Sequence, residues 1–113
     1  IAATAAQLLL ARSWTGFAEV PVLGPEDLSP KEMAVIMSEV LGRTVTFSQT
    51  PLGAYKSMFL AQGHSEAIAQ AMVDMAVTKA NGLDQGVART PQNSTPTTFR
   101  QWCAEVLLPA VEG

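Results

Sequence analysis

The segment from Ser29 to Gly42 is the strongest local folding signal in the sequence. Ser29 can cap a helix N-terminus, Pro30 suits the first helical position, and Glu32 lies where the second half of a capping box belongs. The apolar residues that follow recur at the spacing of one helical face, and Gly42 is a typical helix stop. We therefore predict an amphipathic helix between Ser29 and Gly42.

Two short segments that resemble strands flank this helix. Residues 19–23 carry alternating valines, and residues 44–48 place Val45 and Phe47 on one face. Pro21 lacks the N–H that a central strand position needs, which favours an edge strand. A strand, a helix and a second strand predict a βαβ unit. Two strands cannot cover both faces of a sheet, so this pattern also suggests that more of the sheet lies elsewhere.

The rest of the chain is predicted to be mainly helical. The first helix, rich in Ala and Leu, has no capping residue ahead of Ile1, which suggests a chain that begins inside an element. Thr95 is the predicted N-cap of the last helix, and Pro109 its end. The predicted fold class is α/β, a mostly helical fragment with two short strands and about five helices. The remaining helices are predicted over residues 1–12, 51–62, 65–81 and 95–109, with a polar loop over 83–95.

Composition excludes several classes of function. The 113 residues carry a net charge of −3 with no basic patch, which predicts that nucleic acid is not a partner. Apolar residues make up 48% of the chain, yet no apolar run approaches the roughly 18 residues of a membrane span. The single Cys103 cannot form an internal disulfide, which fits a reducing compartment. We predict a globular cytoplasmic protein that does not bind membranes.

The residues do not predict a self-contained active site. The turn "LGPEDLSP" has one glycine and two acids, whereas a phosphate-binding loop is rich in glycine. His64 and Cys103 show no metal-ligand spacing with the scattered carboxylates. Glu26 and Asp27 are interpreted as solvated acids near a helix N-terminus. We therefore predict no catalytic, cofactor-binding or metal-binding residue in this chain.

Four sequence stretches resemble those of a known family. Their order along the chain resembles that in the C-terminal part of NmrA-like proteins. The stretches are the leading "IAATAAQLLL", then "GPEDLSPKEMAVIMSEVLGR" and the alternating segment after it, and finally the closing "TPTTFRQW". These proteins are the atypical branch of the extended short-chain dehydrogenases/reductases. The resemblance implies that residues 1–113 form one substrate-binding portion. It also implies that the N-terminal Rossmann half, which holds NAD(P) in this family, is absent from the chain.

The resemblance leaves three functions open. The chain could be the substrate-binding part of an NAD(P)-dependent oxidoreductase that acts on a small organic carbonyl or quinone, without catalysing the reaction alone. NmrA-like proteins also include non-catalytic redox sensors that bind dinucleotide and act through protein partners. A stand-alone helical interaction module is the third possibility. The expected partners are the missing N-terminal half, a small-molecule substrate and, for the isolated piece, further copies of itself.

The same resemblance indicates where a substrate would lie. In folds of this kind the ligand occupies the crevice beyond the carboxyl ends of the parallel strands. The segments expected there are the turn after the first strand, the residues after the second strand, and the loop before the last helix. The predicted lining residues are Leu23, Gly24, Pro25, Phe47, Tyr55 and Arg89.

Overall fold

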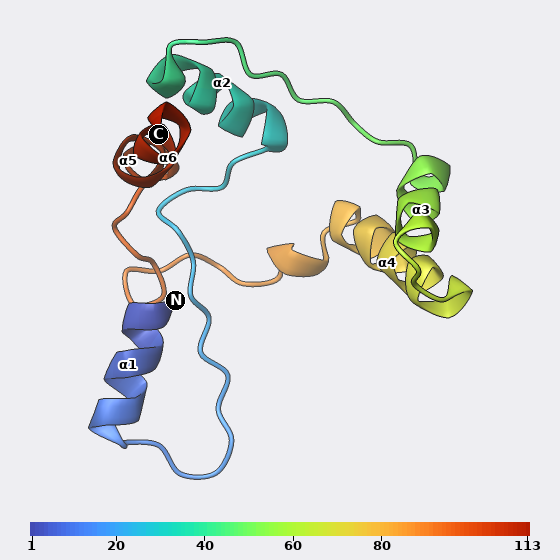
Figure 1. Cartoon of the computed structure of the whole chain (residues 1–113). Coiled ribbons are helices and arrows are strands. Elements are labelled where there is room, and N and C mark those ends of the chain that lie inside the picture. Colours follow the sequence, from blue (N-terminus) through green and yellow to red (C-terminus); the bar gives the residue numbers. More distant parts are fainter. The chain divides into compact units, whose positions relative to one another are not determined.

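The computed structural model describes all residues from 1 to 113, and their contacts divide the chain into two compact units. Unit 1 consists of Ile1–Phe47 and Arg89–Gly113, and unit 2 consists of Ser48–Ala88. Helices dominate both units (Figure 1). None of these helices is both long enough and apolar enough to cross a bilayer.

Unit 1 contains two separate helices and one longer C-terminal helix. Helix α2 packs against the first and middle parts of the C-terminal helix, and Ala34 and Cys103 are buried there. The elements of unit 1 are α1 (Ala2–Ala11), α2 (Pro30–Leu41), α5 (Phe99–Trp102), the π-helical turn η2 (Cys103–Leu107) and α6 (Leu108–Glu112).

The predicted helix α2 is confirmed, together with both of its end signals. The Ser29 hydroxyl accepts a hydrogen bond from the Glu32 N–H at 3.3 Å, and the Glu32 carboxylate accepts one from the Ser29 N–H at 2.7 Å. The hydrogen bonds that the Ser29 N–H and then the Ser29 hydroxyl donate to this carboxylate hold the pKa of Glu32 below its ordinary value. Gly42 ends the helix with a φ of 63°, in the left-handed region that glycine adopts without steric cost.

The predicted βαβ unit is wrong, because the chain contains no sheet. The only β pairing is an isolated parallel bridge between Leu23 and Ser94. The segments 19–23 and 44–48, predicted as two strands, do not pair with each other. The observed fold is therefore helical, and the α/β class with a Rossmann-type unit is not seen.

Competing hydrogen bonds explain why the second predicted strand does not form. The Val45 N–H donates to the Ser38 hydroxyl of α2 at 2.8 Å, and the Val45 carbonyl lies 3.1 Å from the same oxygen. The Ser38 hydroxyl also donates to the Ala34 carbonyl at 2.7 Å. Since both backbone groups of Val45 face α2, they are not available for a strand ladder.

The last helix begins three residues later than predicted. Thr98 caps it, because its side chain accepts a hydrogen bond from the Gln101 N–H at 3.0 Å. Thr95, the predicted cap, instead donates its N–H and its hydroxyl to the Leu23 carbonyl at 2.8 and 3.0 Å. These hydrogen bonds hold Thr95 in the segment that pairs with Leu23, ahead of the helix.

The last helix also continues past Pro109, where it was predicted to end. A proline inside an α-helix removes one hydrogen bond, and its ring clashes with the carbonyl four residues earlier. Here the wider turn η2 precedes the proline, and Pro109 lies in the first turn of α6. The helix thus accommodates Pro109 by changing its hydrogen-bond register.

Unit 2 is a pair of packed helices, α3 (Leu52–Ala61) and α4 (Glu66–Ala80), followed by the short 3₁₀ helix η1 (Leu83–Gln85). Ser65 caps α4 as predicted. The buried residues of α4 are Ala69 and Val73.

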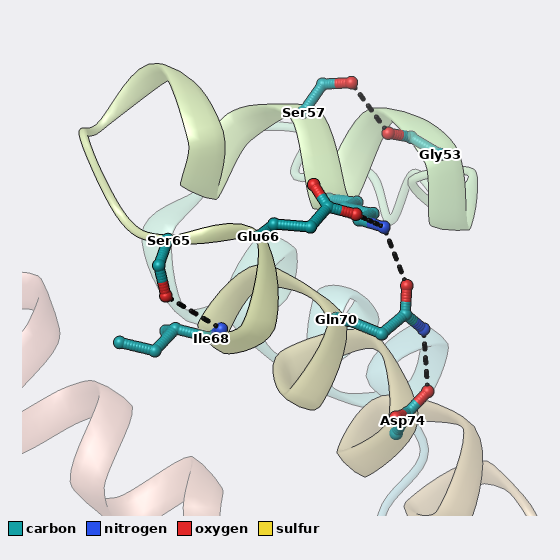
Figure 2. Close-up of polar contacts among 8 residues, drawn as sticks. Gly53, Ser57, Ser65, Glu66, Ile68, Gln70 and Asp74 are labelled. Atoms are coloured by element: carbon teal, nitrogen blue, oxygen red, sulfur yellow. Dashed lines mark hydrogen bonds and ion pairs between the residues drawn. The ribbon is translucent and has the colours of Figure 1, made fainter.

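Polar contacts join α3 to α4 at their surface (Figure 2). The Lys56 ammonium donates to Gln70 at 2.8 Å and forms an ion pair with Glu66. Gln70 in turn donates to Asp74 at 2.8 Å. Exposed contacts of this kind add little to the free energy of folding. Their main effect is on the relative orientation of α3 and α4.

The α2 capping box can be tested by substitution. We expect Ser29→Ala to lower the stability of unit 1 by about 1 kcal/mol, the usual cost of losing a serine N-cap. Urea titration followed by the NMR signals of the α2 amides measures this change. The matched control is Ser13→Ala, an exposed serine of unit 1, which should stay within about 0.5 kcal/mol of the parent chain. Equal effects of the two substitutions would contradict the capping role.

Candidate functional site

Two segments far apart in the sequence meet around Leu23. The Leu23 N–H donates to the Asn93 carbonyl at 2.7 Å, and the Thr95 N–H donates to the Leu23 carbonyl at 2.8 Å. The Arg89 Nε donates to the Gly24 carbonyl at 2.8 Å. These contacts tie residues 23–27 to residues 89–95, and we call the arrangement the Arg89 clasp.

An ion pair completes the Arg89 clasp. The Arg89 Nη2 donates to the Asp27 Oδ1 at 2.5 Å. The Asp27 side chain is 93% exposed, whereas that of Arg89 is only 28% exposed. The carboxylate therefore reaches the guanidinium from the solvent side, while the arginine stem is partly covered.

Local sequence explains why residues 89–95 can present their backbone to Leu23. The Thr90 N–H donates to the Asn93 side-chain oxygen at 2.8 Å, and the Asn93 N–H donates to the Thr90 hydroxyl at 3.3 Å. Ser94 donates its N–H to the Thr90 carbonyl at 3.0 Å. This side-chain-supported turn is typical of Thr and Asn in loops, and it orients the carbonyl of Asn93 and the N–H of Thr95.

The ion pair shifts the titration of both partners. The hydrogen bond from Arg89, and then its positive charge, hold the pKa of Asp27 below its ordinary value. The hydrogen bond to Asp27 raises the pKa of Arg89, and the charges of Asp27 and Glu26 add to this effect. Both groups are thus charged throughout the neutral range. The negative charge of Asp27 offsets the positive charge of the Arg89 guanidinium.

The chemistry available to the Arg89 clasp is binding rather than bond-making. A guanidinium has five N–H donors in a planar fork, so Arg89 keeps donors beyond those that Gly24 and Asp27 accept. No cluster of His, Cys, Asp or Glu in the structure could hold a metal ion. Cys103 is buried, and burial raises the pKa of its thiol, so it is not an activated nucleophile.

The structure brings some of the predicted lining residues together. Leu23, Gly24 and Arg89 belong to the clasp, and Pro25 lies in the same turn. Phe47 lies in unit 1 and is 42% exposed. No observation tests whether any of them contacts a substrate, so their role as lining residues stays a prediction.

Tyr55, the remaining predicted residue, lies on α3 in unit 2. Its ring packs edge to face on Phe59, with the ring centroids 5.0 Å apart. This contact is sufficient to explain a half-buried tyrosine at that position. Its contact with a substrate likewise stays a prediction.

Sequence reasoning missed the partners that hold Arg89. The sequence pattern predicts a solvated acid at Asp27 and a polar loop over residues 83–95. No local pattern links Asp27 to a residue 62 positions away, because their contact depends on how the chain returns. A usable signal was the Thr90–Asn93 spacing, which is typical of a structured turn.

Two surface pockets also occur in unit 1. The first has a volume of about 390 Å³ and is mostly apolar; its lining residues are Ala5, Leu8, Leu9, Trp14, Ala18 and Val20. The second, about 340 Å³, lies at the C-terminal end of α2 and is shallow; its lining residues are Ser38, Glu39, Gly42, Arg43 and Thr44. Neither pocket contains a pair of groups suited to acid–base catalysis.

Comparison with known proteins gives one informative relative. Over 87 residues, 74% of this chain, the sequence is 30% identical to a (4-alkanoyl-5-oxo-2,5-dihydrofuran-3-yl)methyl phosphate reductase from Streptomyces griseus. The chain is similar to part of a reductase. The matched stretch spans only 30% of that protein's length. No family model matches the chain, and no solved structure matches it.

The titration of Asp27 tests the ion pair directly. Since the folded-state pKa is lowered, the pair stabilises the fold fully above the unfolded-state pKa, and this stabilisation is lost as the pH falls through the folded value. We expect the ¹³C signal of the Asp27 carboxyl to titrate below its ordinary range in the parent chain and to return toward that range in Arg89→Met. The control Lys31→Met should leave the Asp27 titration unchanged. Identical Asp27 titrations in all three proteins would contradict the pairing.

Proposed function

We propose that this chain is the substrate-binding part of an NAD(P)H-dependent reductase of the NmrA-like kind, and that its substrate is a small organic carbonyl or quinone. The observation that carries the proposal is the 30% identity over 87 residues to a reductase. The resemblance of "GPEDLSPKEMAVIMSEVLGR" and the flanking segments to NmrA-like proteins supports the same conclusion.

In this proposal the Arg89 clasp holds the polar end of the substrate. The name of the Streptomyces relative's substrate includes an alkanoyl group, an oxo group and a phosphate. Arginine binds both phosphate and carbonyl oxygens. Here Asp27 already neutralises the guanidinium and Glu26 adds a further negative charge, so a phosphate would be repelled. A neutral carbonyl oxygen therefore suits Arg89 better than an anionic group.

The turn before α2 does not fit the pyrophosphate of a dinucleotide. The turn from Leu23 to Ser29 has one glycine and two acids, so it offers neither the close backbone approach nor the charge that a pyrophosphate requires. We therefore assign NAD(P)H binding to a part of the protein outside these 113 residues. This is consistent with a chain that spans 30% of the reductase it matches.

The proposed activity can be tested on the protein as its own cells produce it. Mixing that protein with NADPH and a simple quinone such as 1,4-benzoquinone, or an enone such as cyclohexenone, should oxidise the nucleotide. The 113-residue chain alone should not do so. Nucleotide binding by the longer protein without any oxidation would favour the redox-sensor function and contradict the reductase proposal.

Substitution of Arg89 tests the substrate role of the clasp. We expect Arg89→Met in the longer protein to raise KM for the carbonyl substrate by about 3- to 10-fold, the value of one hydrogen bond to a neutral oxygen. The control Lys31→Met removes an exposed charge from α2 and should leave KM unchanged. An unchanged KM in Arg89→Met would exclude Arg89 as a substrate-binding residue.

A further inference from the structure

The guanidinium of Arg89 is bound along one edge only. Its Nε donates to the Gly24 carbonyl at 2.8 Å, and its Nη2 donates to the Asp27 Oδ1 at 2.5 Å. Nε and Nη2 share one edge of the planar group, and Nη1 has no hydrogen-bond partner in the structure. At the end of the group, one N–H of Nη1 and the second N–H of Nη2 point in the same direction. These two donors are available to a ligand.

The two bound partners hold the guanidinium in a defined orientation. Leu23 is paired through both its N–H and its carbonyl, so the neighbouring Gly24 carbonyl belongs to a fixed stretch of backbone. Asp27 lies three residues further along the same turn. The Arg89 side chain is 28% exposed, so it is also partly packed. An arginine held in this way presents a preformed pair of donors and loses less side-chain entropy when a ligand binds.

A pair of parallel donors favours a ligand with two neighbouring oxygen atoms. One oxygen accepts from Nη1 and the other from Nη2, which gives two hydrogen bonds in place of one. Carboxylates and phosphates match this fork geometry. A 1,3-dicarbonyl compound presents two oxygens in a similar arrangement without a negative charge.

The charges of the Arg89 clasp distinguish between these two kinds of ligand. Residues 23–27 and 89–95 contain one positive side chain, Arg89, and two negative ones, Glu26 and Asp27, which leaves one net negative charge. The hydrogen bond to Asp27, and the charges of Asp27 and Glu26, raise the pKa of Arg89, so both carboxylates act on the guanidinium. An anionic ligand at the free end would lie near two carboxylates and be repelled, whereas a neutral ligand would not.

We propose that the free end of Arg89 binds two neighbouring carbonyl oxygens of one neutral substrate, a 1,3-dicarbonyl compound, and that Asp27 is the residue that excludes carboxylates and phosphates from this position. The inference rests on the substrate-binding role proposed above for the Arg89 clasp. It narrows the substrate class from small carbonyl compounds in general to those with paired carbonyl groups.

Three small, unreactive probes test the inference by binding alone. Dimethyl malonate is neutral with two neighbouring carbonyl oxygens, methyl propanoate is neutral with one, and propanoate is an anion with two oxygens. The ¹⁵Nε signal of Arg89 in the longer protein, assigned by its loss in Arg89→Met, reports binding without NADPH. We expect dimethyl malonate to bind about 3- to 10-fold more tightly than methyl propanoate, the value of one further hydrogen bond. Propanoate should cause no saturable shift.

Substitution of Asp27 tests the origin of this selectivity. Asp27→Asn keeps an oxygen acceptor for Arg89 and removes one negative charge. We expect the variant to bind propanoate at least about 3-fold more tightly than dimethyl malonate, because hydrogen bonds to a charged acceptor are the stronger ones. The matched control Glu112→Gln removes an exposed carboxylate from α6 and should leave all three affinities unchanged. The comparison of the three probes in the parent protein needs no variant to fold.

The possible outcomes separate this inference from the proposed activity. The expected order of affinities supports the paired-carbonyl site even if the protein oxidises no NADPH. Three results would each overturn it even if the protein reduces quinones: equal affinities for dimethyl malonate and methyl propanoate, tighter binding of propanoate by the parent protein, or no saturable binding of dimethyl malonate. An Asp27→Asn protein with the selectivity of the parent would overturn the role of Asp27.

Discussion

The chain carries more apolar side chains than it buries, and this imbalance governs the rest of the structure. Unit 1 buries Ala34 and Cys103, and unit 2 buries Ala69 and Val73. Burial of apolar side chains is the main source of folding free energy, so two small or medium-sized buried residues give each unit only a small core. The helix ends and loops therefore depend on local hydrogen bonds, and α1 contributes no buried residue to either core.

The Arg89 clasp shows how a small core can still define a specific arrangement. Its contacts join the turn before α2 to the segment before α5 through backbone groups of Leu23 and the side chain of Arg89. Because α2 packs on the C-terminal helix, the clasp and this helix pair constrain the same two stretches of chain. A substrate-binding role for Arg89 would use a side chain that the fold already holds in place, which lowers the entropic cost of binding.

Local signals in the sequence predicted the helices well, and non-local contacts account for the failures. Ser29 and Gly42 lie within or next to the helix they delimit, so their effect can be deduced from neighbouring residues. Thr95 and Thr98 are equally good caps in isolation, and only the pairing of Thr95 with Leu23 decides between them. The predicted strands also failed because of contacts that their alternating pattern does not reveal, since Leu23 bonds to the distant Asn93 and Thr95, and Val45 bonds to Ser38 of α2. Arg89 was among the predicted site residues, whereas its partner Asp27 was not.

The most direct test of this account is amide hydrogen exchange of the 113-residue chain by itself. If burial limits stability as described, the α1 amides should exchange nearly as fast as those of an unstructured peptide, because no residue of that helix is buried. The amides around Ala69 and Val73, which are buried in α4, should exchange more slowly. Exchange of α1 as slow as that of α4, at concentrations where the chain is monomeric, would contradict the claim that burial limits stability.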